Sequence, residues 1–587
     1  MKISNGERKK QRFVCVVVTL MTGSLLAAST SAAYSQSLMP APIYLNQGAQ
    51  WTDAQRQAFY TQDQGSTMIP LAWLKALKTE KGEPFLGDEL ARYGYLPNPN
   101  SRYGLPVGFT VNGNGPDAGA GMSCAACHTR QIAVGATSYR IDGGPAIVDF
   151  QSLLVDLVGA VGRVIDCDKD FEPFANAVLG QGADKNQRVV LRGQVEVWYA
   201  REKAMIDHAL PIRDLWGLGR LDAVSMIFNR LSGLDLGPAP TYLIESNIHP
   251  ADAPVRYPFL WNAAIQDKTQ WPGFADNGNN LLGLARNTGE VYGVFATFHP
   301  SPLPFGFVNF NAVNSANWQG LAKLENMIAL IGPPAYPGKV DTTLAKLGEQ
   351  VYNWKTDKVG GQGGCVECHG ETKGAFRSLT RDTWATPIQD VGTDSREYDI
   401  LTRTTDTGVL ANTRLYPGAQ RMPQTGTTFS QLGYSVVGSL LQGGLAKAYK
   451  EMNAAAGASP NDKGPTSGGA LSGAFQAQTQ KNGTNYAYES RVMHGIWAAA
   501  PYLHNGSVPT LADLLSPENV RPTSFALGSE YDLNTLGLAK VQPGSTAVRT
   551  VTPCAQRNSG NSNCGHPFGT NLPPKYKLAL LEYLKVL

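Results

Sequence analysis

The sequence predicts a mainly α-helical protein in two parts, with long loops and a few short hairpins. Its 587 residues exceed what one ordinary hydrophobic core organises, so two or more domains are expected. Apolar residues recur at helical spacing near residues 344–352 and again after Pro573 and Pro574. The 63 glycines and 37 prolines indicate that much of the remaining chain forms turns and loops.

The composition is that of a folded globular protein. Hydrophobic residues make up 42% and charged residues 17% of the chain, which argues against disorder. The formal net charge of +3 is too small to indicate nucleic acid or an anionic membrane as a partner.

The first 33 residues predict an export signal. A basic segment at 8–12 precedes a mostly apolar stretch from Phe13 to Ala28, and Ser31-Ala32-Ala33 offers small residues for cleavage. A membrane anchor is the alternative, but the stretch is shorter than the roughly 20 apolar residues that a span needs. We therefore expect residues 1–33 to be removed, no membrane span after removal, and a periplasmic or secreted protein.

Two Cys-x-x-Cys-His runs carry the clearest chemical signal. They are Cys124-Ala-Ala-Cys127-His128 and Cys365-Val-Glu-Cys368-His369. On a helical turn the three side chains share one face, so two sulfurs can bind the vinyl groups of a haem while the imidazole binds its iron. A zinc or redox Cys-x-x-Cys is the alternative, but two complete runs on an exported chain favour haem. The sequence predicts two covalently bound haems c, each in a cytochrome c-like domain.

The apolar patterns support such a domain around the second run. Leu347, Val351 and Tyr352 predict a helix leading into it, and a second helix is expected to start at Pro573-Pro574. Cytochrome c folds cross two such helices, although an unrelated terminal helix fits the pattern as well. Pro333-Pro334 marks the likeliest boundary, which gives an N-terminal haem domain at 34–335 with large insertions and a C-terminal one at 336–587.

Four cysteines lie outside the two runs. Cys15 belongs to the predicted signal. Cys554 and Cys564 flank a polar loop, and an oxidising compartment favours a disulfide there over two free thiols. Cys167 is then the odd one out and is predicted to be a buried small apolar residue rather than a nucleophile.

Several stretches resemble the bacterial di-haem cytochrome c peroxidase and MauG superfamily, in particular its rubber-oxygenase-like (RoxA-like) branch. They are Gln64-Gly65-Ser66 with Pro70 and Trp73, Tyr139 to Pro145, Pro258-Phe-Leu-Trp261 with Gln270-Trp271, and the run from Gly495 to Pro509. The chain lacks the Phe-Trp-Asp-Gly-Arg-like run of the peroxidases, which favours the oxygenase-like branch. It is also shorter after His369 than the characterised rubber oxygenases, which puts a polymer substrate in doubt.

The resemblance implies ligands for both irons. His504 would be the second axial ligand of the C-terminal haem, opposite His369, and two imidazoles give a low-spin, electron-carrying site. His494 and Met493 are rival ligands, and a surface role for His504 is the alternative. The N-terminal iron would have His128 on one side and no motif-backed ligand on the other. The candidates for that second position, supported by residue type alone and by no motif, are His208, His249, His299 and His566.

The resemblance also suggests residues that assist the haems. Trp261 or Trp271 would relay electrons between them, as a tryptophan does in this superfamily, although a core tryptophan is equally expected. Arg130 and Arg140 follow the first run and could pair with haem propionates, or they could simply be solvated.

Together these observations predict an exported di-haem oxidoreductase. The N-terminal site would activate dioxygen or peroxide, and the C-terminal bis-histidine site would transfer electrons. Oxidative cleavage of an apolar, unsaturated substrate such as polyisoprene is favoured. Hydrogen peroxide reduction and a non-catalytic electron carrier are the alternatives. Expected partners are the small-molecule oxidant, an organic or polymer substrate and an electron-donor protein, and the sequence does not reveal whether calcium binds.

Overall fold

The computed structural model describes residues 40–587, except 213–214, 356–363, 380–381 and 455–485. The predicted signal peptide, residues 1–33, lies outside the described residues. Within the described part of the chain, no helix combines the length and the apolar character that crossing a membrane requires.

The prediction of a mainly α-helical fold with two cytochrome c-like haem domains is wrong. Helices account for 39% and strands for 16% of the structure, which is mixed α/β with many small sheets. Each sheet among the described residues has only two or three strands. The physical reason is the loop content: long connections carry backbone groups that need partners once buried, and short ladders supply them. Two-residue strands have no periodicity that a sequence pattern could reveal.

The described α-helices range in length from four to 25 residues. The α-helices are α1 (Asp53–Thr61), α2 (Leu71–Ala76), α3 (Cys124–Cys127), α4 (Phe150–Asp166), α5 (Asp168–Leu179), α6 (Lys185–Ala209), α7 (Ala223–Asn229), α8 (Asn280–Gly293), α9 (Trp318–Ile328), α10 (Thr342–Tyr352), α11 (Cys365–His369), α12 (Arg396–Ile400), α13 (Thr428–Ser439), α14 (Leu445–Ala454), α16 (Leu511–Leu514) and α17 (Pro574–Leu584).

The strands are mostly very short. They are β1 (Ile43–Tyr44), β2 (Ile69–Pro70), β3 (Phe109–Asn112), β4 (Gly119–Met122), β5 (Thr129–Val134), β6 (Thr137–Asp142), β7 (Arg220–Leu221), β8 (Val255–Arg256), β9 (Lys268–Thr269), β10 (Ala275–Asp276), β11 (Phe298–Leu303), β12 (Phe307–Asn314), β13 (Ile388–Gln389), β14 (Thr404–Asp406), β15 (Thr425–Thr427), β16 (Tyr488–Glu489), β17 (Ser524–Ala526), β18 (Tyr531–Asp532), β19 (Gly537–Leu538) and β20 (Val548–Thr550).

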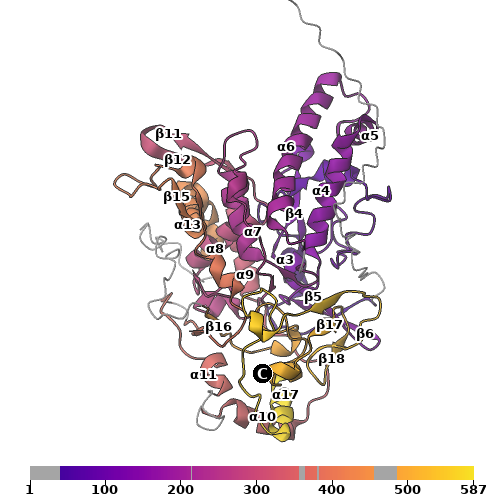
Figure 1. Cartoon of the computed structure of the whole chain (residues 1–587), viewed down its shortest axis with the longest axis vertical. Coiled ribbons are helices and arrows are strands. Elements are labelled where there is room, and N and C mark those ends of the chain that lie inside the picture. Colours follow the sequence, from indigo (N-terminus) through magenta and orange to yellow (C-terminus); the bar gives the residue numbers. More distant parts are fainter. Residues whose placement is uncertain (1–39, 213–214, 356–363, 380–381, 455–485) are drawn as a thin grey trace, which may run out of the picture.

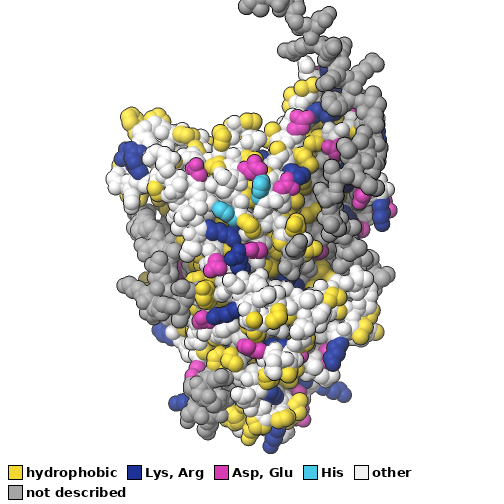
Figure 2. All heavy atoms as spheres, viewed as in Figure 1, with side chains coloured by type: hydrophobic (Ala, Val, Ile, Leu, Met, Phe, Trp, Pro, Cys, Tyr) yellow, Lys and Arg dark blue, Asp and Glu magenta, His cyan; other side chains and the backbone are white. Residues whose placement is uncertain are grey.

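The molecule has two upper lobes above a lower body (Figure 1). Helices α4, α5 and α6 form one lobe, while α7, α8, α13 and the β11–β12 hairpin form the other. The lower body contains α10, α11 and α17. Figure 2 shows charged and histidine side chains gathered in the hollow between the lobes, whereas apolar side chains are scattered elsewhere on this face.

Helices α10 and α17 confirm the two helices predicted at the ends of the C-terminal part. They pack closely together because α10 presents Gly348 to α17, where an added Cβ would meet the carbonyl oxygen of Ala579 at 1.9 Å. Tyr352 then stands beside Tyr583, with ring centroids 5.4 Å apart. Its hydroxyl donates to the carbonyl oxygen of His369 at 2.9 Å, so this helix pair fixes the second Cys-x-x-Cys-His turn.

The first turn runs directly into the β5–β6 hairpin, which is anchored by a buried carboxylate. Asp142, at the end of β6, accepts from Arg56 Nε at 2.7 Å and from Trp51 Nε1 at 2.8 Å. Tyr60 donates to the same carboxylate at 2.5 Å. These bonds tie α1 to the hairpin and satisfy a charge that would be costly to bury alone. Asp142 lies in the Tyr139 to Pro145 run that carries the family resemblance.

Both Cys-x-x-Cys-His turns pack on one hydrophobic cluster. Cys124 and Cys365 each contact a core that contains Trp261, Trp497 and Leu581. This cluster combines residues from both sides of the boundary expected near 335, and the boundary itself stays a prediction. Cys167, predicted to be buried, instead lies partly exposed at the junction of α4 and α5.

Two candidate haem sites

The first turn holds its histidine ready to bind a metal. The Nδ1 atom of His128 lies 2.8 Å from the carbonyl oxygen of Pro258. Because a carbonyl only accepts, Nδ1 carries the hydrogen and Nε2 keeps its lone pair for a metal. Burial lowers the pKa of His128 to about 4, which keeps the imidazole neutral.

The second turn repeats this arrangement. The Nδ1 atom of His369 lies 2.7 Å from the carbonyl oxygen of Arg491, so its Nε2 again keeps the lone pair that a metal would need. Burial lowers the pKa of His369 as well. The two carbonyls are themselves connected, because Arg491 Nη1 donates to the carbonyl oxygen of Phe259, the residue after Pro258.

Each turn faces a large cavity. The first cavity, of about 1570 Å³, is lined by Cys124, Cys127 and His128. Much of the opposite wall is apolar and includes Phe150, Leu221, Val224, Ile227, Phe295 and Ile328. None of the histidines named for the sixth position, 208, 249, 299 or 566, lines this cavity, whereas Met122 and Met226 do.

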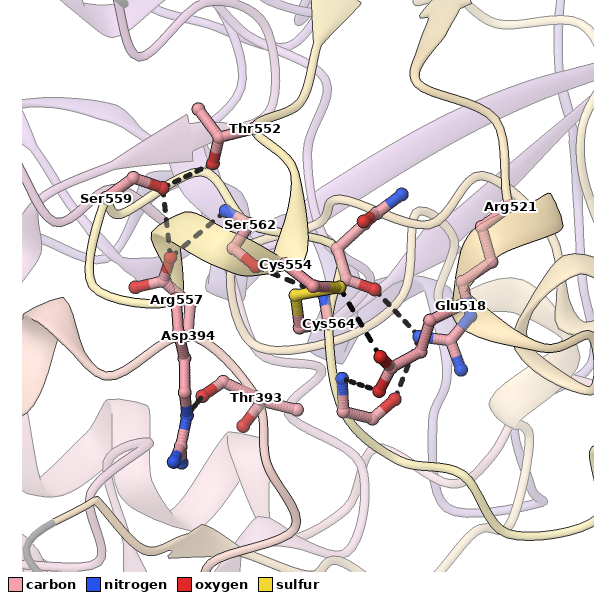
Figure 3. Close-up of a disulfide and its surroundings, with 12 residues drawn as sticks. Thr393, Asp394, Glu518, Arg521, Thr552, Cys554, Arg557, Ser559, Ser562 and Cys564 are labelled. Carbon is pink, nitrogen blue, oxygen red and sulfur yellow. Dashed lines mark hydrogen bonds between the residues drawn. A yellow bond between two sulfur atoms is a disulfide. The ribbon is translucent and has the colours of Figure 1, made fainter.

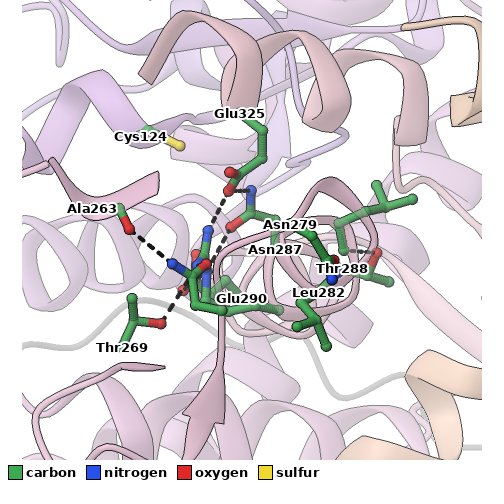
Figure 4. A network of polar contacts seen from close by, with 12 residues as sticks. Cys124, Ala263, Thr269, Asn279, Leu282, Asn287, Thr288, Glu290 and Glu325 are labelled. Carbon is green, nitrogen blue, oxygen red and sulfur yellow. Dashed lines mark hydrogen bonds and ion pairs between the residues drawn. The ribbon is translucent and has the colours of Figure 1, made fainter. Parts of the chain in front are cut away.

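A buried polar network forms part of the first cavity wall (Figure 4). Arg286 pairs with Glu325, which also accepts from Asn287 Nδ2 at 2.5 Å. Glu290 accepts from Gln270 Nε2 at 2.6 Å and lies 3.5 Å from Arg286 Nε. Burial raises the pKa of Glu290 and outweighs the attraction of Arg286. Burial therefore favours the protonated form of Glu290.

The second cavity, of about 1310 Å³, is lined by Cys365, Cys368 and His369. His504, His566 and Met493 also line it, but His494 does not. His494 lies instead 2.9 Å from Glu371, a half-exposed partner outside the cavity wall.

Of the histidines in the second cavity, His566 lies close to His369. Its ring centroid lies 6.2 Å from that of His369. Two imidazoles bound at about 2 Å to one metal between them have centroids about 6 Å apart. His504 instead stacks on Tyr488, with centroids 4.0 Å apart. The family resemblance did not single out His566. The sequence around His566 contains no motif, so only its residue type made it a candidate.

The loop before His566 is closed by the disulfide Cys554–Cys564, which confirms the pairing favoured from the sequence (Figure 3). The Gly565 amide donates to Glu518 Oε1 at 2.6 Å, and Arg521 Nη1 donates to the Gly565 carbonyl at 2.8 Å. The His566 amide donates to the Val391 carbonyl at 2.8 Å. Among the described residues, Glu518 and these two cysteines form the one close group of candidate metal ligands, but both sulfurs are used in the disulfide.

The two cavities share a wall. The residues that line both are Arg256, Phe259, Trp271, Glu489 and Arg491. Trp271 donates from Nε1 to the Arg256 carbonyl at 3.0 Å, and the Arg256 guanidinium lies 4.8 Å from its ring centroid. Trp261 lines neither cavity and is fully buried, with Nε1 donating to the His494 carbonyl at 2.8 Å.

The residues around both turns fit haem c. Each cavity has two cysteines and a neutral histidine on one wall, as the two thioethers and the iron require. Arg256 is buried, faces both cavities and has an Nη1 atom without a hydrogen-bond partner, which suits a propionate. Arg130 and Arg140, the arginines suggested for that role, line neither cavity. Arg130 donates to the Ala500 carbonyl, and Arg140 donates to Gln131.

Comparison with known proteins agrees with the chemistry of these sites. A family model described as RoxA-like, cytochrome c-like matches residues 487–526, the segment that contains Glu489 and His504. Such a domain implies haem c and fits a haem-dependent oxidoreductase.

Two curated proteins of Sinorhizobium fredii are similar to this chain. The uncharacterized protein y4iM is 38% identical over 102 residues, which cover 16% of this chain and 23% of y4iM. The uncharacterized protein y4iJ is 30% identical over 601 aligned positions, which cover 92% of each protein. The chain therefore belongs to the same family as y4iJ, and it carries a RoxA-like cytochrome c-like domain.

Proposed function

We propose that this protein is an exported di-haem c-type oxidoreductase that activates dioxygen or peroxide at its N-terminal site and exchanges electrons at its C-terminal site. One observation carries the proposal: two Cys-x-x-Cys-His turns hold their histidines through the same Nδ1-to-carbonyl bond, and each faces its own cavity. When bound, haem c supplies a redox-active iron at each site. The export signal supports a periplasmic or secreted location, where haem c is attached.

The residues opposite each turn support the division of roles. His128 has no histidine partner among the residues that line the first cavity, which leaves room for an oxidant. In the second cavity His566 stands opposite His369, so we assign it as the second ligand. The assignment of His504, which rests on the family resemblance, is the alternative.

Trp271 is the better candidate for an electron relay. It lies in the wall between the cavities, whereas Trp261 lies outside both linings. The Arg256 guanidinium over the Trp271 ring holds it in place. An external electron-donor protein would supply or accept electrons at the C-terminal site.

An apolar, unsaturated substrate is favoured by the shape of the first site. A further, mostly apolar cavity of about 530 Å³ adjoins the first cavity, and the residues that line both are Val224, Ile227, Gln270, Arg286 and Glu290. Its other walls include Phe228, Phe274, Phe429 and Leu432. Such walls suit a hydrocarbon chain better than a small polar molecule, and a polymer such as polyisoprene is the test substrate.

Peroxide reduction is the second candidate, and Glu290 favours it. A carboxyl group that holds a proton in the cavity wall can supply it when an O–O bond breaks. Here Gln270 orients Glu290, and Arg286 provides positive charge beside it.

Absorption spectra of the purified protein test the proposal. We expect one low-spin haem and one that responds to carbon monoxide, cyanide or peroxide. Two low-spin haems without any response would mean that both irons are closed, for example by Met122 or Met226 at the first site, and that the protein is an electron carrier.

A paired assay separates the two reactions. One sample receives polyisoprene with dioxygen, and the other receives reduced cytochrome with peroxide. Turnover in the second assay alone would reject the oxygenase reaction and leave the peroxidase.

A further inference from the structure

Glu489 is a buried carboxylate in the wall between the two sites, and the proposed haem chemistry gives it no role. It forms β16 with Tyr488 and pairs with β13, where Glu489 lies opposite Ile388. Its amide donates to the Trp271 carbonyl at 2.8 Å, which fixes it beside the proposed electron relay. The side chain is 2% exposed and lines both cavities.

Positive groups surround Glu489 without neutralising it. Arg491 Nε lies 3.4 Å from its Oε1, and Arg256 on β8 and Arg286 on α8 also attract its charge. Its Oε2 atom has no hydrogen-bond partner. Burial outweighs the three arginines and raises the pKa of Glu489 to about 7.

Acidic groups face the same region from α12 and its surroundings. Glu397 on α12 lines the first cavity and is buried, with Oε2 unpartnered. Burial, followed by the charges of Asp222, Glu489 and Asp394, raises the pKa of Glu397 well above its ordinary value. Burial therefore favours the neutral form of Glu397, whereas the pKa of Glu489 lies at about 7, where its charge can change.

We propose that Glu489 binds one proton from solvent when the iron at either site takes one electron from an external donor, and releases it when the electron leaves. The iron gains one electron and the carboxylate gains one proton, so the net charge of the buried region stays constant. An uncompensated charge is costly in such surroundings, which is why the two transfers are coupled. This inference rests on the proposed function, because it requires haem at the two sites.

The coupling has a definite sign. Below pH 7 Glu489 is already neutral and does not oppose the incoming electron. Above pH 7 it is an anion, so reduction becomes less favourable and the reduction potential falls as the pH rises. One proton per electron corresponds to a tenfold change in the equilibrium constant per pH unit, or about 59 mV.

A spectroelectrochemical titration between pH 6 and pH 8, without dioxygen or peroxide, tests the proposal. In the wild type we expect the potential of at least one haem to fall with pH, by up to about 59 mV per pH unit. Glu489→Gln should lose most of this slope and keep both haems. Glu530→Gln, at a partly exposed carboxylate that lines neither cavity, should keep it.

Several results would overturn the proposal. They are pH-independent potentials in the wild type, an unchanged slope in Glu489→Gln, or loss of the slope in Glu397→Gln, which would move the role to Glu397. If Glu489→Gln does not load haem, Glu489→Asp should shift the pH at which the slope is centred, and an unshifted slope would count against Glu489. Failure of the proposed function would look different: the protein would lack haem, or its irons would not respond to carbon monoxide, cyanide or peroxide. The titration contains no dioxygen or peroxide, so its result does not depend on either reaction.

Discussion

The two Cys-x-x-Cys-His turns are locally alike but stand in different surroundings. In both, the histidine donates from Nδ1 to a backbone carbonyl at 2.7–2.8 Å. The first turn, α3, lies in the middle of the molecule with Ala125 and Ala126 buried, whereas α11 lies at the lower edge and buries none of its residues (Figure 1). In the proposed function, the less buried turn would be the one that a redox partner approaches, and the covered one would exclude water.

The larger difference lies opposite the turns. Of these two cavities, Glu290, Glu325 and Arg286 line only the first, whereas His504 and His566 line only the second. In the proposed function, the Cys-x-x-Cys-His turn would fix the cofactor, while residues distant in the sequence would decide whether its iron reacts or carries electrons.

The largest expected effect comes from removing the histidine opposite the second turn. His566→Ala should leave both haems attached, because the thioethers depend on the four cysteines, but it should convert one haem from low spin towards high spin. His504→Ala is the matched control and should keep the low-spin spectrum, since its ring stacks on Tyr488.

The reverse pattern would support the assignment made from the family resemblance and would refute the role of His566. Unchanged spectra in both variants would point to Met493, which also lines the cavity. Low-temperature electron paramagnetic resonance of the oxidised protein distinguishes the three outcomes.

The second-largest effect is expected from replacing Glu290, which lines the first cavity but not the second. Glu290→Gln should lower the rate of reaction with peroxide by about 10²–10⁴-fold, the usual contribution of a positioned acid or base. In the wild type this rate should fall as the pH rises through the pKa of Glu290, which burial raises above its ordinary value. Glu371→Gln, at a residue that lines neither cavity, should have the wild-type rate in stopped-flow measurements.

A third variant tests the wall that separates the sites. Trp271→Phe should slow electron transfer between the haems by about tenfold, equivalent to about 1.4 kcal/mol in the barrier. Trp261→Phe should leave the rate unchanged, because Trp261 lies outside both cavity linings. Flash photolysis of the half-reduced carbon monoxide complex measures this rate, and equal rates in the two variants would exclude Trp271 as the relay.

Local sequence patterns predicted those structural features whose residues lie close together in the sequence. The Cys-x-x-Cys-His turns, helices α10 and α17, and the disulfide of Cys554 with Cys564 belong to this group. The shared wall could not be predicted, because Trp271 meets Glu489 through a backbone bond across 218 positions of sequence (489 − 271). The mixed α/β fold was missed for the same reason, since β13 and β16 are two-residue strands that form only when distant segments meet.

The smallest expected effect on function concerns the backbone behind each turn. At the first turn an added Cβ on Gly108, whose φ is +74°, would lie 1.9 Å from the amide nitrogen of Ala126. At the second site a Cβ on Gly348 would meet the Ala579 carbonyl at the same distance. Each Gly→Ala change should cost about 1–3 kcal/mol of stability through overpacking, and Gly108→Ala should cost more because its positive φ adds strain.

Thermal unfolding followed at the haem absorbance of each site measures these costs. Gly108→Ala should loosen the first site at a lower temperature, and Gly348→Ala the second, because α10 holds the His369 carbonyl through Tyr352. Gly193→Ala, in α6 with nothing within 4 Å of the added Cβ, is the control and should be neutral or stabilising by up to about 1 kcal/mol. If both variants weakened the two sites equally, the sites would share one unfolding unit, as the common core beneath Cys124 and Cys365 allows. Separate responses would instead show that each turn depends on its own supporting backbone, so that the two sites differ in stability as well as in ligands.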